Sequence, residues 1–112
     1  MLQNGAKVCL SDIDEIKGNE TKILYQKQFG LNDNGVCFVK CDVAVKEAWS
    51  ELWNTAEKLL EGPIEILVNN AGVNPVRGWK VCMDIMIYGV MMGSYIARDK
   101  MGVTKVFFYI TH

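Results

Sequence analysis

The stretch Ile66-Leu67-Val68-Asn69-Asn70-Ala71-Gly72-Val73 decides the class of fold that this sequence predicts. It opens with apolar residues that do not alternate with polar ones, which is typical of a strand covered on both faces in a parallel sheet. Amide-bearing and small residues follow at once. In open α/β sheets the ligand lies outside the carboxyl ends of the strands, where Asn70, Ala71 and Gly72 are expected. The stretch therefore predicts a buried strand that leads into a binding site, although a strand followed by an ordinary polar turn has the same pattern.

Strand and helix patterns alternate along the rest of the chain. The first strand is short and predicted to be buried, and the helix after it is polar and interrupted by Gly18. The predicted elements are, in order, a strand at residues 7–11, a helix at 14–30, a strand at 36–40, a helix at 44–60, a strand at 65–69, a helix at 76–100 and a strand at 105–110. The β-α-β-α-β order predicts a parallel α/β arrangement with right-handed crossovers.

Two of the predicted helices carry apolar patterns of different kinds. The helix at 44–60 is amphipathic, because apolar residues recur every four places and two tryptophans lie on the adjacent face: Ala48, Leu52, Ala56, Leu60, Trp49 and Trp53. The helix at 76–100 is apolar over most of residues 81–97, yet this run includes Asp84 and is shorter than the roughly 20 apolar residues of a membrane span. We therefore expect a long buried helix and no membrane association.

The amino-acid composition excludes several classes of protein. Half of the 112 residues are hydrophobic, which suits a folded core and argues against disorder. Twelve basic and 13 acidic residues leave a net charge of −1, so there is no electrostatic footprint for nucleic acid. The four cysteines are scattered and lack a companion histidine, which predicts neither a metal site nor a disulfide framework. We expect a cytoplasmic protein, because its thiols suit a reducing compartment and its start lacks the features of a secretory signal.

Several short motifs occur in an order that points to one family. Asn69-Asn70-Ala71-Gly72 follows directly on the apolar run, Gly5-Ala6-Lys7-Val8 precedes Asp12, Cys41-Asp42-Val43 stands between them, and residues 79–101 come after. In this order and spacing the motifs resemble the short-chain dehydrogenase/reductase family, whose members are Rossmann-fold nicotinamide oxidoreductases. The resemblance implies an α/β fold of three layers (α/β/α), with residues 1–112 forming a single partial domain. The doubly wound parallel sheet would be incomplete, running from the family's second strand to about its fifth.

The resemblance also implies a cofactor and the residues that bind it. An acid at the end of the family's second strand, here Asp12, accepts hydrogen bonds from the adenosine ribose and repels a 2′-phosphate, so NAD is expected. Asp42 would contact the adenine amino group with Val43 beside the ring. The full set of expected cofactor-binding residues is Asp12, Ile13, Cys41, Asp42, Val43, Asn70, Ala71 and Gly72. The structural alternative is that Asp12 and Asp14 cap the helix that follows them, and that Asp42 caps the next helix in the same way.

The family's catalytic groups are not identifiable in these residues. The glycine-rich phosphate loop is expected before residue 1 and the Tyr-x-x-x-Lys pair after residue 110. Met86 holds the position of the family's helix Asn, and a thioether cannot replace an amide as donor. The implied parent activity is oxidation of a secondary alcohol, a small molecule or lipid, to a ketone, with this chain inactive alone. The alternatives are a non-catalytic pseudoenzyme or dimerisation module that pairs through helix 77–100 as a homo- or heterodimer, and an incomplete product without a role of its own.

Overall fold

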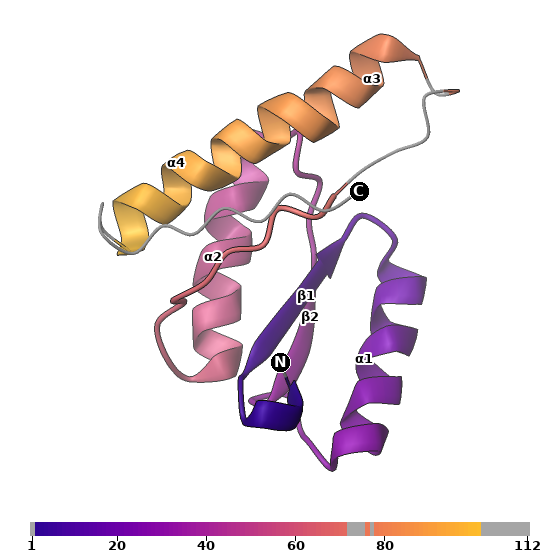
Figure 1. Ribbon diagram of the computed structural model, residues 1–112, viewed down its shortest axis with the longest axis vertical. Coiled ribbons are helices and arrows are strands. Elements are labelled where there is room, and N and C mark those ends of the chain that lie inside the picture. Colours follow the sequence, from indigo (N-terminus) through magenta and orange to yellow (C-terminus); the bar gives the residue numbers. More distant parts are fainter. Residues whose placement is uncertain (1, 72–75, 77, 102–112) are drawn as a thin grey trace. The chain divides into compact units, whose positions relative to one another are not determined.

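The computed structural model describes residues 2–71, 76 and 78–101. The elements are the 3-10 helix η1 (Leu2–Asn4), strand β1 (Val8–Asp12), helix α1 (Glu15–Phe29), strand β2 (Val36–Lys40), helix α2 (Lys46–Leu60), helix α3 (Trp79–Met83), the π-helical turn η3 (Asp84–Tyr88) and helix α4 (Gly89–Met101). Figure 1 shows them along the chain, with α3 and α4 forming one long rod. The predicted strand at 105–110 lies outside the described residues.

The chain divides into two compact units. The first contains Met1–Cys41 with Glu51–Pro63, and the second contains Asp42–Ser50 with Ile64–His112. Helix α2 thus contributes its first turn to the second unit and its remainder to the first. Each unit is described below by itself.

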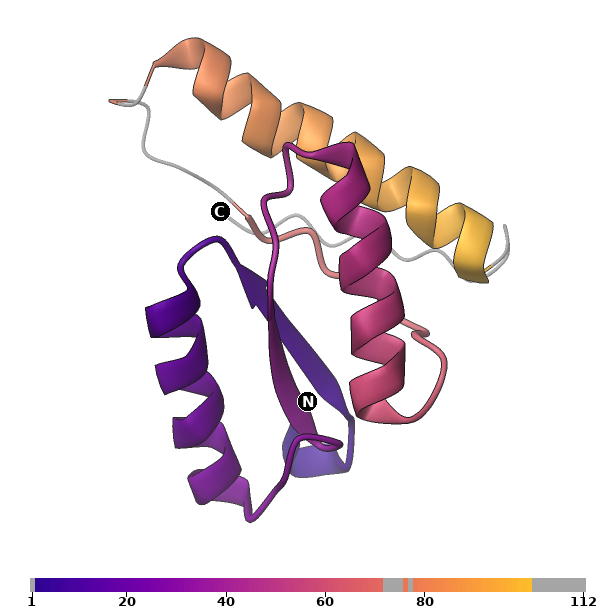
Figure 2. The same cartoon turned by 180° about the vertical axis from the view of Figure 1, so that it is seen from behind.

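The sheet of the first unit is parallel, as the sequence predicts. Strands β1 and β2 pair in register, Val8 opposite Val36 and Asp12 opposite Lys40. Helix α1 lies on one side of these strands and the later part of α2 on the other (Figures 1 and 2). Among the described residues these are the only two paired strands, so the α/β class with a parallel sheet is confirmed.

The prediction of a strand at residues 65–69 is wrong. Residues 64–68 have no regular structure, and Asn69 forms only an isolated bridge. Ile66 and Val68, expected to be buried on both faces, are 52% and 42% exposed. A strand exists only where a neighbour pairs with it, and in the described part of the chain no strand pairs with this run. Strand β1 is likewise only half-buried rather than buried, since its single paired neighbour is β2.

The long helix differs from its prediction in burial. The helix Trp79–Met101 spans 23 residues and is long and apolar enough to cross a membrane, so the expectation that it falls short of a span is wrong by that criterion. Only 17% of its most apolar window is buried, and the helix is therefore not the buried core helix that we expected. Core helices of soluble proteins also meet this length and composition test, so the test itself assigns no membrane. The exposure shows that the described residues do not cover its apolar side chains.

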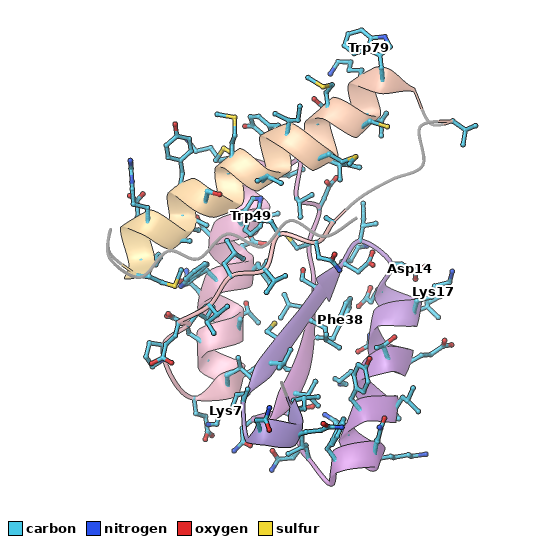
Figure 3. The ribbon with its side chains drawn as sticks, viewed as in Figure 1. Lys7, Asp14, Lys17, Phe38, Trp49 and Trp79 are labelled. Atoms are coloured by element: carbon cyan, nitrogen blue, oxygen red, sulfur yellow. The ribbon has the colours of Figure 1, made fainter. Side chains whose placement is uncertain are left out.

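Helix α1 begins and ends with clear caps. The Oδ1 atom of Asp14 accepts a hydrogen bond from the Lys17 N–H at 3.0 Å, which satisfies one of the unpaired donors of the first turn. Figure 3 shows Asp14 and Lys17 together at this end. Gly30 ends the helix in the left-handed conformation with a φ of 64°, which glycine adopts without strain. The predicted helix at 14–30 is thus confirmed to within one residue at each end.

Gly18 does not interrupt α1, contrary to its predicted role. The helix is continuous across it, and Gly18 is buried where α1 meets β2. A Cβ built at Gly18 would overlap the ring of Phe38, which in Figure 3 points from β2 toward α1. The glycine is needed for this close approach of helix and sheet, a tertiary requirement that the local sequence does not reveal.

Gly18→Ala should therefore destabilise the chain although alanine is the better helix former. Overpacking of this kind costs about 1 to 3 kcal/mol, whereas alanine gains about 1 kcal/mol over glycine inside a helix. We expect a net loss of stability in urea unfolding. In a Phe38→Leu background the same change should be neutral or stabilising. Gly62→Ala is the matched control, because a Cβ at Gly62 meets nothing within 4 Å. Equal losses at Gly18 with and without Phe38 would contradict the proposed close contact.

Helix α2 is amphipathic, as predicted, but in its first half the buried face lies one residue later in the sequence than the predicted apolar series. The helix runs from Lys46 to Leu60, and its buried side chains are Trp49, Trp53, Ala56 and Leu60. Ala48 and Leu52, which belong to the predicted apolar series, are only half-buried. The large indole side chains occupy the buried stripe because they remove more apolar surface from water than the smaller residues do.

Candidate functional site

Asp12 stands at the carboxyl end of β1, as expected for a ribose-binding acid. Its side chain is exposed, and its Oδ1 atom accepts a hydrogen bond from the Asp14 N–H at 3.0 Å. That bond fixes the turn between β1 and α1, while the cap of α1 is Asp14. The structural alternative therefore holds for Asp14 rather than for Asp12, whose carboxylate keeps acceptor capacity for a ligand hydroxyl. Ile13, next to it, is also exposed.

A small hollow of about 180 Å³ adjoins Asp12 in the first unit. Its charged members are Asp12 and Lys17, and the rest are apolar or small. The lining residues are Leu10, Ser11, Asp12, Lys17, Gly18, Thr21 and Phe38. An acid at a strand end beside a shallow hollow can accept hydrogen bonds from a diol and disfavour a phosphate. The residues at this strand end therefore fit the adenosine ribose of NAD in chemistry and in position.

Cys41 joins the ends of the two strands in the first unit. It is buried, and its backbone N–H donates to the carbonyl oxygen of Asp12 at 3.1 Å. This bond extends the β1–β2 pairing by one residue beyond Lys40. Cys41 therefore acts on Asp12 through the backbone, by holding the strand end that carries the carboxylate.

Asp42 and Val43 belong to the second unit and form a tight turn there. The Oδ1 atom of Asp42 accepts from the Ala44 N–H at 3.0 Å, and its carbonyl accepts from the Val45 N–H at 3.0 Å. The carbonyl of Val43 accepts from the indole N–H of Trp49 at 2.9 Å. The Val43 side chain lies against α4, where a Cβ added to Gly89 would come within 2.9 Å of it. Hydrogen bonds thus hold the turn at both ends. They use only one oxygen of the Asp42 carboxylate, so the second oxygen can accept a hydrogen bond from a ligand.

The described residues of the Asn-Asn-Ala-Gly motif differ in their burial. Asn69 is buried, and its side-chain Nδ2 has no hydrogen-bond partner in the described part of the chain. Its Oδ1 lies where α4 approaches, 2.8 Å from the Cβ that Gly93 lacks. Asn70 and Ala71 are exposed. Gly72 lies outside the described residues, so its predicted place at the cofactor stays a prediction.

Met86 lies in the middle of the π-helical turn η3. Here the Gly89 N–H donates to the carbonyl of Asp84, five residues back, instead of four as in an α-helix. Such turns place an extra residue in one helical turn and are frequent at functional sites. The sequence does not predict this turn, because nothing in the local pattern distinguishes it from an apolar α-helix.

A larger hollow, of about 450 Å³, lies in the second unit between the start of α2 and α4. It is rich in aromatic side chains and has one basic and one acidic residue. The lining residues are Lys46, Trp49, Ser50, Tyr88, Met92, Tyr95, Ile96 and Asp99. None of the expected cofactor-binding residues lines it, so it is separate from the candidate cofactor site. Among the described residues no group of three or more His, Cys, Asp or Glu side chains could hold a metal ion.

Comparisons with known proteins agree with this geometry. The chain belongs to the short chain dehydrogenase family, whose sequence profile matches residues 1–105. It is 36% identical over 103 residues to 15-hydroxyprostaglandin dehydrogenase (NAD(+)) of Bos taurus, covering 90% of this chain and 37% of that protein. It is 31% identical over 103 residues to zerumbone synthase of Zingiber zerumbet, covering 82% of this chain and 36% of that protein.

A solved structure of a putative short-chain dehydrogenase from Novosphingobium aromaticivorans gives the same assignment. It superposes with a TM-score of 0.77 at 26% identity, covering 89% of this chain and 38% of that protein. The chain thus spans little more than a third of the length of these relatives. The family that the sequence motifs indicate is therefore confirmed, and within it the chain is similar to the prostaglandin dehydrogenases.

Proposed function

We propose that this chain forms the adenosine side of the NAD site of a short-chain dehydrogenase, of the type that oxidises the 15-hydroxyl of a prostaglandin to a ketone. The observation that carries the proposal is Asp12, an exposed acid at the carboxyl end of β1 beside a hollow. The relative that shares 36% of the aligned residues is named for NAD(+). We also propose a reducing, cytoplasmic setting, in keeping with four cysteines that form no disulfide.

Each expected residue has a distinct part in binding. The bound cofactor supplies the acceptor for the hydride of the alcohol. Asp12 would accept the ribose hydroxyls, and Ile13 would lie beside it. Asp42 and Val43 would receive the adenine, while Asn70 would offer its amide and Ala71 and Gly72, with little or no side chain, would let the ligand approach the backbone closely. These residues bind and orient the cofactor, and no proton transfer is assigned to any of them.

The discrimination between NAD and NADP tests the role of Asp12. Asp12→Ala combined with Ile13→Arg should relax or reverse a preference for NAD, because a repulsive carboxylate is removed and a phosphate partner is added. Losing a hydrogen bond to a charged group costs about 1.5 to 3 kcal/mol, or roughly 10- to 100-fold in the Kd of NAD. Both dissociation constants are measured by fluorescence titration, in the 112-residue chain and in a version completed with the flanking segments of a relative.

The control for the Asp12 experiment is a substitution at Asp14, in the same turn between β1 and α1. Asp14→Ala removes the cap of α1 but leaves the Asp12 carboxylate, so it should lower stability and leave the ratio of NAD to NADP affinity unchanged. Equal affinity for the two cofactors before any mutation would show that Asp12 only shapes the turn.

A second candidate function is that of a non-catalytic pseudoenzyme that pairs through helix 77–100. The observation in its favour is the exposed apolar surface of this helix, which the described residues leave uncovered: Trp79, Val81, Met83, Ile87, Tyr88, Met91 and Tyr95. The coding sequence on either side discriminates between the proposals. A glycine-rich loop before residue 1 and a Tyr-x-x-x-Lys pair beyond residue 110 would favour the enzyme.

A further inference from the structure

Two cysteines from different strands stand side by side in the first unit. Cys9 on β1 and Cys37 on β2 are register partners in the parallel ladder. Register partners point to the same face of a sheet, and strands lie about 4.8 Å apart. That spacing falls inside the range of roughly 4.4 to 6.8 Å between Cα atoms that a disulfide requires. The pair faces away from α1, because the neighbouring Phe38 faces that helix.

The two thiols differ in access to solvent. Cys37 is 1% exposed, whereas Cys9 is half-buried and can be reached by a small reagent. The nearby Cys37 thiol raises the pKa of Cys9, as does the burial of Cys9, and the Cys9 thiol donates to the carbonyl oxygen of Leu10 at 3.7 Å. The nearby Cys9 thiol lowers the pKa of Cys37. The thiol that a reagent can reach is therefore the one that loses its proton less readily.

The remaining cysteines are placed differently. Cys41 follows the end of β2 and is buried, and Cys82 lies on α3 in the second unit. None of the four cysteines forms a disulfide in this structure. Only Cys9 and Cys37 are paired by strand register, so the sheet itself selects them from the four.

We propose that Cys9 and Cys37 form a redox-sensitive dithiol, which a low-molecular-weight disulfide such as glutathione disulfide converts to an intramolecular disulfide. In the first step Cys9 loses its proton to solvent, which its raised pKa makes slow, and the resulting thiolate attacks the glutathione disulfide, forms a mixed disulfide at Cys9 and releases one glutathione thiolate. In the second step the Cys37 thiolate attacks the Sγ atom of Cys9 and releases the second glutathione thiolate. Two protein thiols are oxidised, one glutathione disulfide is reduced to two glutathiones, and the protons go to solvent or to glutathione.

The bond would tie the two strands together close to the candidate cofactor site. Cys9 precedes Asp12 by three residues on β1, and the backbone of Cys41 already joins Asp12 to the end of β2. A link at Cys9 and Cys37 closes a loop that contains α1 and reduces the freedom of the unfolded chain. It would therefore hold β1 and β2 in register and raise the temperature of unfolding. This inference does not depend on the proposed cofactor.

The test uses the folded 112-residue chain and glutathione disulfide. After incubation the free thiols are trapped with iodoacetamide and the chain is digested and mapped by mass spectrometry. We expect a peptide pair linked through Cys9 and Cys37 as the main product, with a higher midpoint of thermal unfolding, both reversed by dithiothreitol. Cys37→Ala should stop at the mixed disulfide on Cys9, and Cys9→Ala should leave Cys37 reduced.

Cys82→Ala is the matched control, and it should form the same link as the unmodified chain. If a cysteine variant fails to fold, the mapping of the unmodified chain alone still decides. A mixed disulfide that persists on Cys9, a link that involves Cys41 or Cys82, or no reaction at Cys9 while the chain remains folded would overturn the proposal.

Discussion

The 112-residue chain is expected to show no NAD-dependent oxidation of a secondary alcohol. Tyr25, Tyr88 and Tyr95 are followed four places later by Phe, Met and Asp rather than by Lys, and Tyr109 has no Lys after it in this sequence. Met86 holds the place of the family's helix Asn. A positioned acid or base typically contributes about 100- to 10,000-fold to the rate, and this sequence has no Tyr-x-x-x-Lys pair to serve in that role.

The measurement is the absorbance of NADH formed from a 15-hydroxyprostaglandin, with a tag-only preparation as control. Met86→Asn alone should restore nothing, since the amide of that position supports a proton relay whose other members are lacking. Turnover clearly above the control, and abolished by Asp12→Ala, would show that the expectation is wrong. Because NAD binding is measured separately, failure of the cofactor proposal and failure of this expectation are distinguishable.

Amide hydrogen exchange is expected to separate the paired strands from residues 64–68. Amides in the β1–β2 ladder are hydrogen-bonded, and those of residues 64–68 belong to no ladder among the described residues. If opening of the ladder costs even about 5 kcal/mol, the low end for a whole domain, its amides exchange some thousands of times more slowly than free ones. Residues 65–68 should exchange near the rate of an unstructured chain.

The same exposure of apolar side chains should make the isolated chain only marginally stable. Ile66 and Val68 present apolar surface to water, as does much of the helix Trp79–Met101. Exposed apolar patches favour association, so we expect aggregation or dependence on a partner. The experiment follows exchange by mass spectrometry on the purified monomer, alongside a thermal melt. Strong protection at both residues 8–10 and 66–68, with one cooperative transition, would contradict this prediction.

Local pattern accounts for the elements that the sequence predicts correctly. The strand at 36–40 is predicted to the residue, and α1 and α2 are placed within one or two residues of their ends. In each case the signal is short-range: a cap at Asp14, a glycine at Gly30, or an apolar run bounded by polar residues. The family too is read from the sequence alone, because its motifs keep their order and spacing along the chain.

The sequence by itself therefore determined the α/β class, the order of the elements, the family and the acid at the end of β1. Only the tertiary structure decided which apolar runs are buried, that Gly18 admits Phe38, and that Cys9 stands opposite Cys37. Burial and strand register depend on contacts between residues far apart in the chain, and a one-residue slip would turn each side chain to the other face. Residues 64–68 show the same principle, since an apolar run becomes a strand only when a neighbouring strand supplies its hydrogen-bond partners.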